Sequence, residues 1–259
     1  MTAGTPQAGR PKDVRTEADV IAPDGATLRT QLVLPDGPPP TGGWPGVLVL
    51  AEVWGVHPYI TAVGERFAAR GWAAAMPDIL SAGTTTGCLV KALREIAGGK
   101  PGVTVDRLEA VRAWFAGRAE VDGDRIAVIG FCLGGGLALL LGSASDGIGA
   151  VSANYGQAPT TETLRGCAPV IAAYGSKDKA IGPQAKVLEK RLTEAGVEHD
   201  VRSYDTGHSF LTPGHSPKLS HRLMGTFIKP VMRGGYDPGP AEEEWARIYA
   251  WFEAHLPGA

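Results

Sequence analysis

Cys132 lies in a glycine-rich stretch whose pattern is typical of a nucleophile elbow. Residues 130–136 read GFCLGGG, between an apolar β-branched run at 125–129 and a Leu-rich run at 137–141. These flanks predict a buried strand and a buried helix, and G-x-C-x-G-G between them matches the strand–turn–helix elbow with cysteine in place of serine. Glycine on both sides leaves room for a tight turn, and a helix N-terminus favours a thiolate. The alternative is a buried cysteine packed beside a glycine-rich helix start.

Two more polar side chains follow predicted strands later in the chain. Asp178 ends the stretch YGSKD after a predicted strand at 169–174, and His208 lies in YDTGHSF after a predicted strand at 199–204. Taken singly, each is more often an ordinary turn or loop residue. The order of nucleophile, acid and histidine, however, is that of α/β-hydrolases. We therefore predict that His208 takes the thiol proton and that Asp178 orients and stabilises the imidazole.

Strands alternate with helices along the whole chain, which predicts a doubly wound, mostly parallel sheet. Pro23-Asp24-Gly25 predicts a hairpin turn, and so an antiparallel hairpin at one edge. We expect a leader at 1–14 without stable structure and one domain at 15–259. The predicted strands are 20–21, 27–34, 46–51, 72–76, 125–129, 149–153, 169–174 and 199–204, and the predicted helices are 59–70, 89–96, 105–115, 184–195 and 242–255.

Composition argues against several classes of partner. The chain has 259 residues, of which 44% are hydrophobic, and a net charge of −2, so no basic surface for nucleic acid or anionic lipid is expected. The three cysteines, Cys88, Cys132 and Cys167, lack metal-site spacing and favour a reducing compartment. No signal-peptide pattern or membrane-length apolar run is seen. We expect a cytoplasmic monomer or weak homodimer that uses neither metal nor cofactor.

From about residue 14 to 256 the chain resembles the dienelactone hydrolase (carboxymethylenebutenolidase) family of α/β-hydrolases. The matching pieces are AEVWGV at 51–56, PD at 77–78, GFCLGG at 130–135, GSKD at 175–178 and GHSF at 207–210. The resemblance implies an α/β-hydrolase fold and the triad already predicted from the residues. It also implies an accessory carboxylate near the thiol and two backbone N–H groups that form an oxyanion hole. The site residues are then Cys132, Asp178 and His208 (triad), Glu52 (carboxylate), Leu133 and Val53 (oxyanion hole), with Trp54, His57 and Phe210 lining the substrate pocket.

The chain departs from this family where arginines hold the carboxylate of dienelactone. It has Ile-Leu-Ser at 79–81 and Phe-Leu-Thr-Pro-Gly at 210–214 instead. A buried carboxylate needs a paired cation, so we predict a preference for neutral substrates unless Lys100, Arg107 or Arg222 replaces the missing charge. The segments 81–102 and 211–236 are long and are candidates for a lid.

The predicted function is hydrolysis of a small ester or lactone through an acyl-cysteine intermediate. Two alternatives use the same triad, namely an acyltransferase, in which another nucleophile replaces water, and a thioesterase. A third, from a different class, is a ligand-binding sensor with residual activity.

Overall fold

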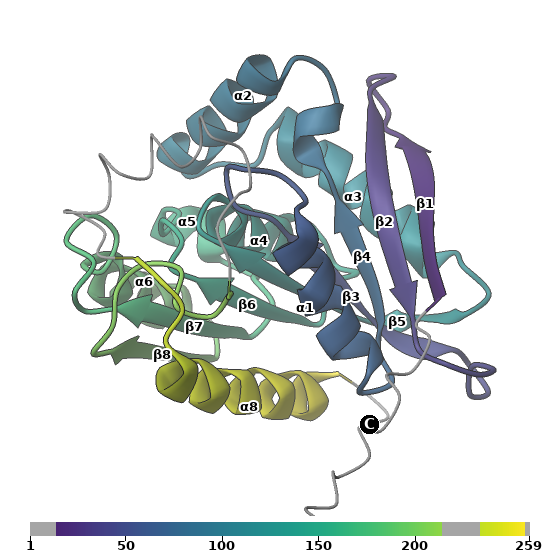
Figure 1. Ribbon diagram of the computed structural model, residues 1–259. Helices are drawn as coiled ribbons and strands as arrows, with labels where there is room; N and C mark the ends of the chain where they lie inside the picture. The colour runs from purple at the N-terminus through teal and green to yellow at the C-terminus, as the bar shows by residue number, and fades with distance from the viewer. Residues whose placement is uncertain (1–13, 214–233, 257–259) are drawn as a thin grey trace, which may run out of the picture.

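The computed structural model describes residues 14–213 and 234–256, which form an eight-stranded sheet flanked by helices (Figure 1). The strand order is β1-β2-β4-β3-β5-β6-β7-β8, in which every pair from β4 to β8 is parallel and β2 is antiparallel to both of its neighbours. This is the predicted mostly parallel α/β architecture. The strands are β1 (Val14–Ile21), β2 (Thr27–Leu34), β3 (Trp44–Leu50), β4 (Ala73–Pro77), β5 (Val121–Phe131), β6 (Ala150–Asn154), β7 (Val170–Gly175) and β8 (His199–Tyr204).

The β1–β2 hairpin forms one edge of the sheet, and β8 forms the other (Figure 1). The turn of the β1–β2 hairpin forms as predicted. Gly25 has a φ of 80°, and the Asp24 carboxylate accepts the N–H of Ala26 at 3.2 Å. β1 begins at Val14, six residues before the start predicted for it, because residues 14–19 pair with residues 29–34 of β2. Residues 1–13, most of the expected leader, lie outside the described residues.

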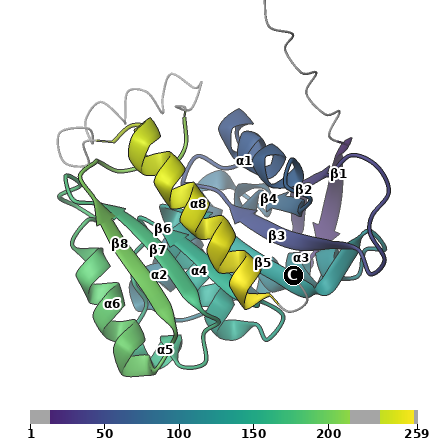
Figure 2. The ribbon, with the colours of Figure 1, turned by 90° about the horizontal axis from the view of Figure 1, so that it is seen from below.

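Helices cover both faces of the sheet. Phe67 of α1 packs against Trp245 and Phe252 of α8, so these two helices share one face, and Figure 2 shows α8 lying across the sheet. α3 and α4 contact each other and β5 on the opposite face, where α2, α5 and α6 join them. The helices are α1 (Pro58–Ala68), α2 (Thr85–Gly98), α3 (Val103–Ala116), α4 (Leu133–Ala144), α5 (Thr161–Leu164), α6 (Gln184–Ala195) and α8 (Pro238–His255), with a 3₁₀ turn, η1, at Ile79–Ser81.

The segment 81–102 is mostly helix α2, which is longer than the predicted 89–96. Thr84 caps its N-terminus by accepting the N–H of Gly87 at 3.2 Å, and Gly99, in the left-handed conformation at φ 62°, ends it. Ile96 is buried against the glycine face of α4. Most of the other candidate lid segment, 214–233, lies outside the described residues, as does Arg222.

The central strands supply the core. Every residue of β4, β6 and β7 is buried, as expected for parallel strands covered on both faces. The carboxyl ends of the parallel strands therefore meet at one edge of the sheet, and the polar residues that follow those strands gather there. In the described part of the chain, no helix is long and apolar enough to cross a membrane.

Candidate active site

Cys132 sits on a strained turn between β5 and α4. Its backbone has φ 53° and ψ −111°, a conformation that L-residues rarely adopt. A Cβ on Gly130 would lie 2.0 Å from the carbonyl oxygen of Gly134, and one on Gly134 would lie 2.2 Å from that of Leu50. No larger residue fits at either position without moving the backbone. The glycines thus let α4 start directly against the end of β3, with the half-buried Cys132 at the turn.

Asp178 and His208 meet across the ends of β7 and β8. His208 Nδ1 lies 2.7 Å from Asp178 Oδ2, and both side chains are buried. The other carboxylate oxygen of Asp178 accepts the N–H groups of Ala180 and Ile181, at 2.9 and 3.1 Å. This turn leaves Oδ2 for the imidazole. Asp178 therefore fixes the position of the ring through its contact with Nδ1.

The charges of these groups support one another. Burial disfavours imidazolium, but the negative charge of Cys132 and the hydrogen bond to Asp178 outweigh it and raise the pKa of His208 to about 10. Burial also disfavours the carboxylate of Asp178, yet the hydrogen bonds from His208 and the turn N–H groups hold the pKa of Asp178 below its ordinary value. A thiol beside an imidazole that a carboxylate orients is an arrangement suited to nucleophilic attack on an acyl group.

Glu52 is buried at the end of β3, and hydroxyl groups bond both of its oxygens. Ser209 Oγ donates to Oε1 at 2.7 Å and Tyr59 Oη donates to Oε2 at 3.3 Å. Ser209 has a φ of 57° and directly follows His208, so the Glu52 carboxylate is tied to the loop that carries the histidine. The sequence predicts Glu52 as a site residue but indicates neither hydroxyl partner. Ser209 lies 157 positions from Glu52, so no local pattern could show that contact.

The two backbone N–H groups predicted for an oxyanion hole lie on adjoining segments. Leu133 is the first residue of α4, so its N–H has no partner within the helix. Val53 follows Glu52 in a tight turn in which the Gly55 N–H donates to the Glu52 carbonyl at 3.1 Å. Since Gly134 packs on the end of β3, these two segments approach each other beside Cys132.

The predicted pocket residues have different environments. Phe210 has no exposed surface, and its ring packs against Tyr155 and Tyr204, so it supports the site from beneath. His57 is half-buried, with its ring centroid 6.0 Å from that of Tyr59, and Trp54 is half-buried in the loop after β3. Of the three, His57 and Trp54 retain exposed surface at this edge of the sheet.

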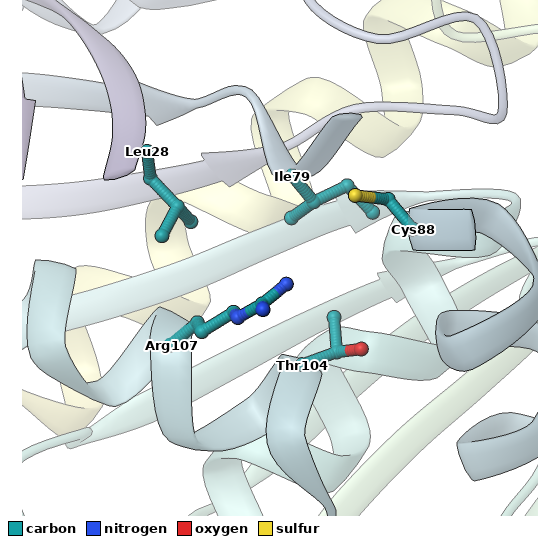
Figure 3. Close-up of a pocket in the computed structure, with 5 residues that line it drawn as sticks. All are labelled: Leu28, Ile79, Cys88, Thr104 and Arg107. Carbon is teal, nitrogen blue, oxygen red and sulfur yellow. The ribbon is translucent and has the colours of Figure 1, made fainter. Parts of the chain in front are cut away.

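Arg107 belongs to a different part of the fold. Figure 3 shows its guanidinium pointing into a small pocket lined by Leu28, Ile79, Cys88 and Thr104. Its Nε and Nη2 donate to Asp24 Oδ2 at 3.1 and 2.7 Å. This charge is already paired with the hairpin turn, so Arg107 does not replace a substrate-binding arginine.

A basic residue that sequence reasoning missed lies at the catalytic edge of the sheet. Arg29 of β2 extends an exposed side chain whose Nη2 lies 3.9 Å from Asp78 Oδ2. Asp78 follows β4 and packs against Gly55 of the loop after β3. The antiparallel direction of β2 places Arg29 here, far in sequence from the positions where the family carries its arginines.

Among the described residues, no three His, Cys, Asp or Glu side chains are grouped so that they could hold a metal ion.

This fold and the strand-end site define an α/β-hydrolase that acts on esters or lactones. The model of the dienelactone hydrolase family matches residues 28–256, and the chain belongs to that family. A carboxymethylenebutenolidase of a Pseudomonas species is 29% identical over 210 residues, which cover 75% of this chain and 87% of that protein.

Two solved structures share the fold. One is a dienelactone hydrolase-like promiscuous phosphotriesterase from metagenomic libraries, with a TM-score of 0.74 and 21% identity, covering 93% of this chain and 99% of that one. The other is a dienelactone hydrolase from Anabaena variabilis, with a TM-score of 0.65 and 18% identity, covering 96% and 100%.

Proposed function

We propose that this protein hydrolyses small neutral esters or lactones through an acyl-cysteine intermediate on Cys132. The observation that carries the proposal is a strained Cys132 at a strand–helix turn, electrostatically coupled to a histidine whose Nδ1 is held 2.7 Å from Asp178. Strain of this kind persists only where the surrounding structure enforces it, and it concentrates at functional sites.

In the first half-reaction the Cys132 thiolate attacks the carbonyl carbon, and the resulting oxyanion accepts hydrogen bonds from the N–H groups of Leu133 and Val53. The intermediate collapses as imidazolium His208 donates its proton to the leaving alkoxide, which departs as an alcohol or stays attached as the opened lactone. Neutral His208 then removes a proton from water, which attacks the acyl-cysteine. The acid product leaves, and the thiolate and imidazolium are restored.

The test is rapid mixing with p-nitrophenyl acetate. Wild type should release a burst of p-nitrophenol of about one equivalent per site, because the activated ester acylates Cys132 faster than water removes the acyl group. Cys132→Ala should abolish the burst and the steady rate with an unchanged melting temperature, and Cys132→Ser should retain part of the rate. Cys167→Ala is a matched control, because Cys167 is also a free thiol but is buried against α4. Hydrolysis by Cys132→Ala within tenfold of wild type would refute the covalent mechanism.

The same assay separates the alternative functions. Release that accelerates when an alcohol or amine acceptor is added indicates an acyltransferase, and a higher kcat/KM for thioesters indicates a thioesterase. Tight ligand binding with no burst indicates a sensor.

We further propose that residues 15–259 form one domain preceded by a leader at 1–14, and that the protein is a cytoplasmic monomer or weak homodimer. The free state of Cys88, Cys132 and Cys167 supports a reducing compartment. Limited proteolysis tests the domain, cell fractionation tests the location, and light scattering tests the oligomeric state.

A further inference from the structure

Tyr155 is a strained, fully buried aromatic residue at the candidate site, and the proposed mechanism gives it no role. Among the described residues, three other than glycine have a positive φ: Cys132, Tyr155 at 42°, and Ser209. The first is the proposed nucleophile, and the third follows the histidine. A positive φ at a bulky aromatic residue is a true outlier that costs free energy, so the surrounding structure must enforce it.

The turn that holds Tyr155 is fixed by contacts on both sides. The Tyr155 N–H donates to the Ala173 carbonyl at 2.7 Å, and Tyr174 Oη donates to the Gly156 carbonyl at 2.8 Å. On the other side, the Cys132 N–H donates to the Asn154 carbonyl at 3.0 Å. The turn after β6 is therefore bonded both to the nucleophile elbow and to the strand that leads to Asp178.

The Tyr155 side chain extends from this turn to the imidazole. Its ring centroid lies 4.9 Å from that of His208, with the planes inclined by 58°. Phe131 and Phe210 pack against the same tyrosine ring, at 6.2 and 5.9 Å. Asp178 fixes one nitrogen of the imidazole, but the imidazole ring could still rotate about that hydrogen bond. The Tyr155 ring lies beside the imidazole and blocks this rotation.

We propose that the aromatic ring of Tyr155 is a positioning group that keeps His208 aligned between Asp178 and Cys132 and favours its imidazolium form. The catalytic consequence of this role rests on the proposed function, whereas the alignment of His208 by Tyr155 does not. The charged or titratable groups around His208 are Asp178 from the β7 turn, Cys132 from the elbow, and Glu52 through Ser209. Tyr155 adds an aromatic ring, and a cation beside such a ring is stabilised by its quadrupole.

The hydroxyl of Tyr155 is not required for this role. It is buried beside Thr212, and burial, together with the negative charges of Glu52 and Cys132, raises the pKa of Tyr155 well above its ordinary value. The phenol therefore stays neutral over the working pH range and cannot act as a base. This separates two explanations, because Tyr155→Phe removes only the hydroxyl, whereas Tyr155→Leu removes the aromatic ring.

In the activity test, Tyr155→Phe should stay within about threefold of wild type. Tyr155→Leu should lower kcat by about tenfold or more and leave KM within about threefold, because a misaligned base weakens chemistry rather than binding. Tyr155→Met serves if the leucine variant folds poorly, since methionine fills irregular space. Phe115→Leu, a ring deletion in the core at α3, is the control for general loss of packing. If Tyr155→Phe loses as much as Tyr155→Leu, or Tyr155→Leu loses no more than Phe115→Leu, the proposal is overturned.

A second test is independent of the covalent mechanism. In a Cys132→Ala background, NMR titration of His208 should show a pKa lower by about half a unit to one unit when Tyr155 is also changed to Leu, and unchanged when it is changed to Phe. An unchanged or higher pKa in the leucine variant overturns the proposed stabilisation. This result stands even if Cys132 proves not to be the nucleophile, so the two proposals can fail separately.

Discussion

The hydroxyl of Ser209 donates a hydrogen bond to Glu52 Oε1 at 2.7 Å, joining residues 157 positions apart. This contact connects the loop after β3, which carries a proposed oxyanion donor, to the loop after β8, which carries His208. Since Tyr59 bonds the other oxygen, Glu52 is held as an acceptor in the described structure rather than left free to rotate.

The first prediction is that Glu52→Ala lowers kcat by about a hundredfold, the usual contribution of a positioned acid–base group, and changes the pH dependence of iodoacetamide trapping at Cys132. Ser209→Ala should have a smaller effect in the same direction, because Tyr59 still holds the carboxylate. Superimposable trapping profiles with unchanged kcat would reduce Glu52 to a structural residue.

The second prediction follows from the raised pKa of His208, about 10. The imidazolium persists below that pH, so it places a positive charge beside the Cys132 sulfur throughout the neutral range and should speed alkylation of Cys132 there. In His208→Gln the alkylation rate should fall at least tenfold at pH 7. His199→Gln is the control, because His199 begins β8, at the opposite end of the strand from His208. Its Nδ1 contacts the carbonyl of Val197. An unchanged alkylation rate in His208→Gln would contradict this role of the imidazolium.

The fold was predictable because its evidence is local. Apolar β-branched runs predict the strands, and Asp24-Gly25 predicts the hairpin. The polar residues that follow the last two strands predict that Asp178 meets His208. The missed features arise from tertiary structure. In the sequence, Tyr155 is an ordinary residue after a strand. Its positive φ, and the backbone hydrogen bonds that link its turn to the elbow and to β7, are features of the tertiary structure. Arg29 reaches the catalytic edge only because β2 runs antiparallel, which no spacing rule would show.

The third prediction concerns the close approach of α4 to β3. Gly134→Ala places a methyl group about 2.2 Å from the Leu50 carbonyl oxygen, so it should shift the elbow, destabilise the protein and remove activity. Gly98→Ala is the matched control, since a Cβ there meets nothing within 4 Å and Gly98 is the last residue of α2. That substitution should stabilise by up to about 1 kcal/mol. Equal melting temperatures for the two variants would contradict the packing argument.

The fourth prediction is a pH-dependent stability effect at Glu244 of α8, which bonds to Tyr204 and Arg247. Burial outweighs these partners and raises the pKa of Glu244 from 4.5 to about 7. The unfolded chain therefore ionises first, and wild type loses stability as pH rises from about 4.5 to 7. Glu244→Gln removes this loss, so its unfolding free energy relative to wild type should improve by about 1 to 3 kcal/mol between pH 5 and 8.

Urea unfolding at both pH values measures this difference. Glu242→Gln is the control, because Arg66 holds the pKa of the exposed Glu242 below its ordinary value, so this carboxylate is ionised at both pH values and the variant should show no change between them. A Glu244→Gln difference that is independent of pH would mean that the Glu244 carboxylate is charged throughout this range.

The last prediction concerns substrate charge. Arg107 is paired with Asp24, and the positions where related enzymes carry arginines hold Ile79, Leu80 and Phe210. A neutral ester should therefore show a higher kcat/KM than its carboxylated analogue, since no cation among the described residues is dedicated to a carboxylate entering the site. Arg29 is the cation placed to modify this result, so Arg29→Gln should lower kcat/KM for the anion by about two- to fivefold and leave the neutral ester unchanged. Lys100→Gln, a change at an exposed residue just after α2, should alter neither value. A clear preference of wild type for the anion that survives Arg29→Gln would contradict this prediction, because a cation other than Arg29 would then hold the carboxylate.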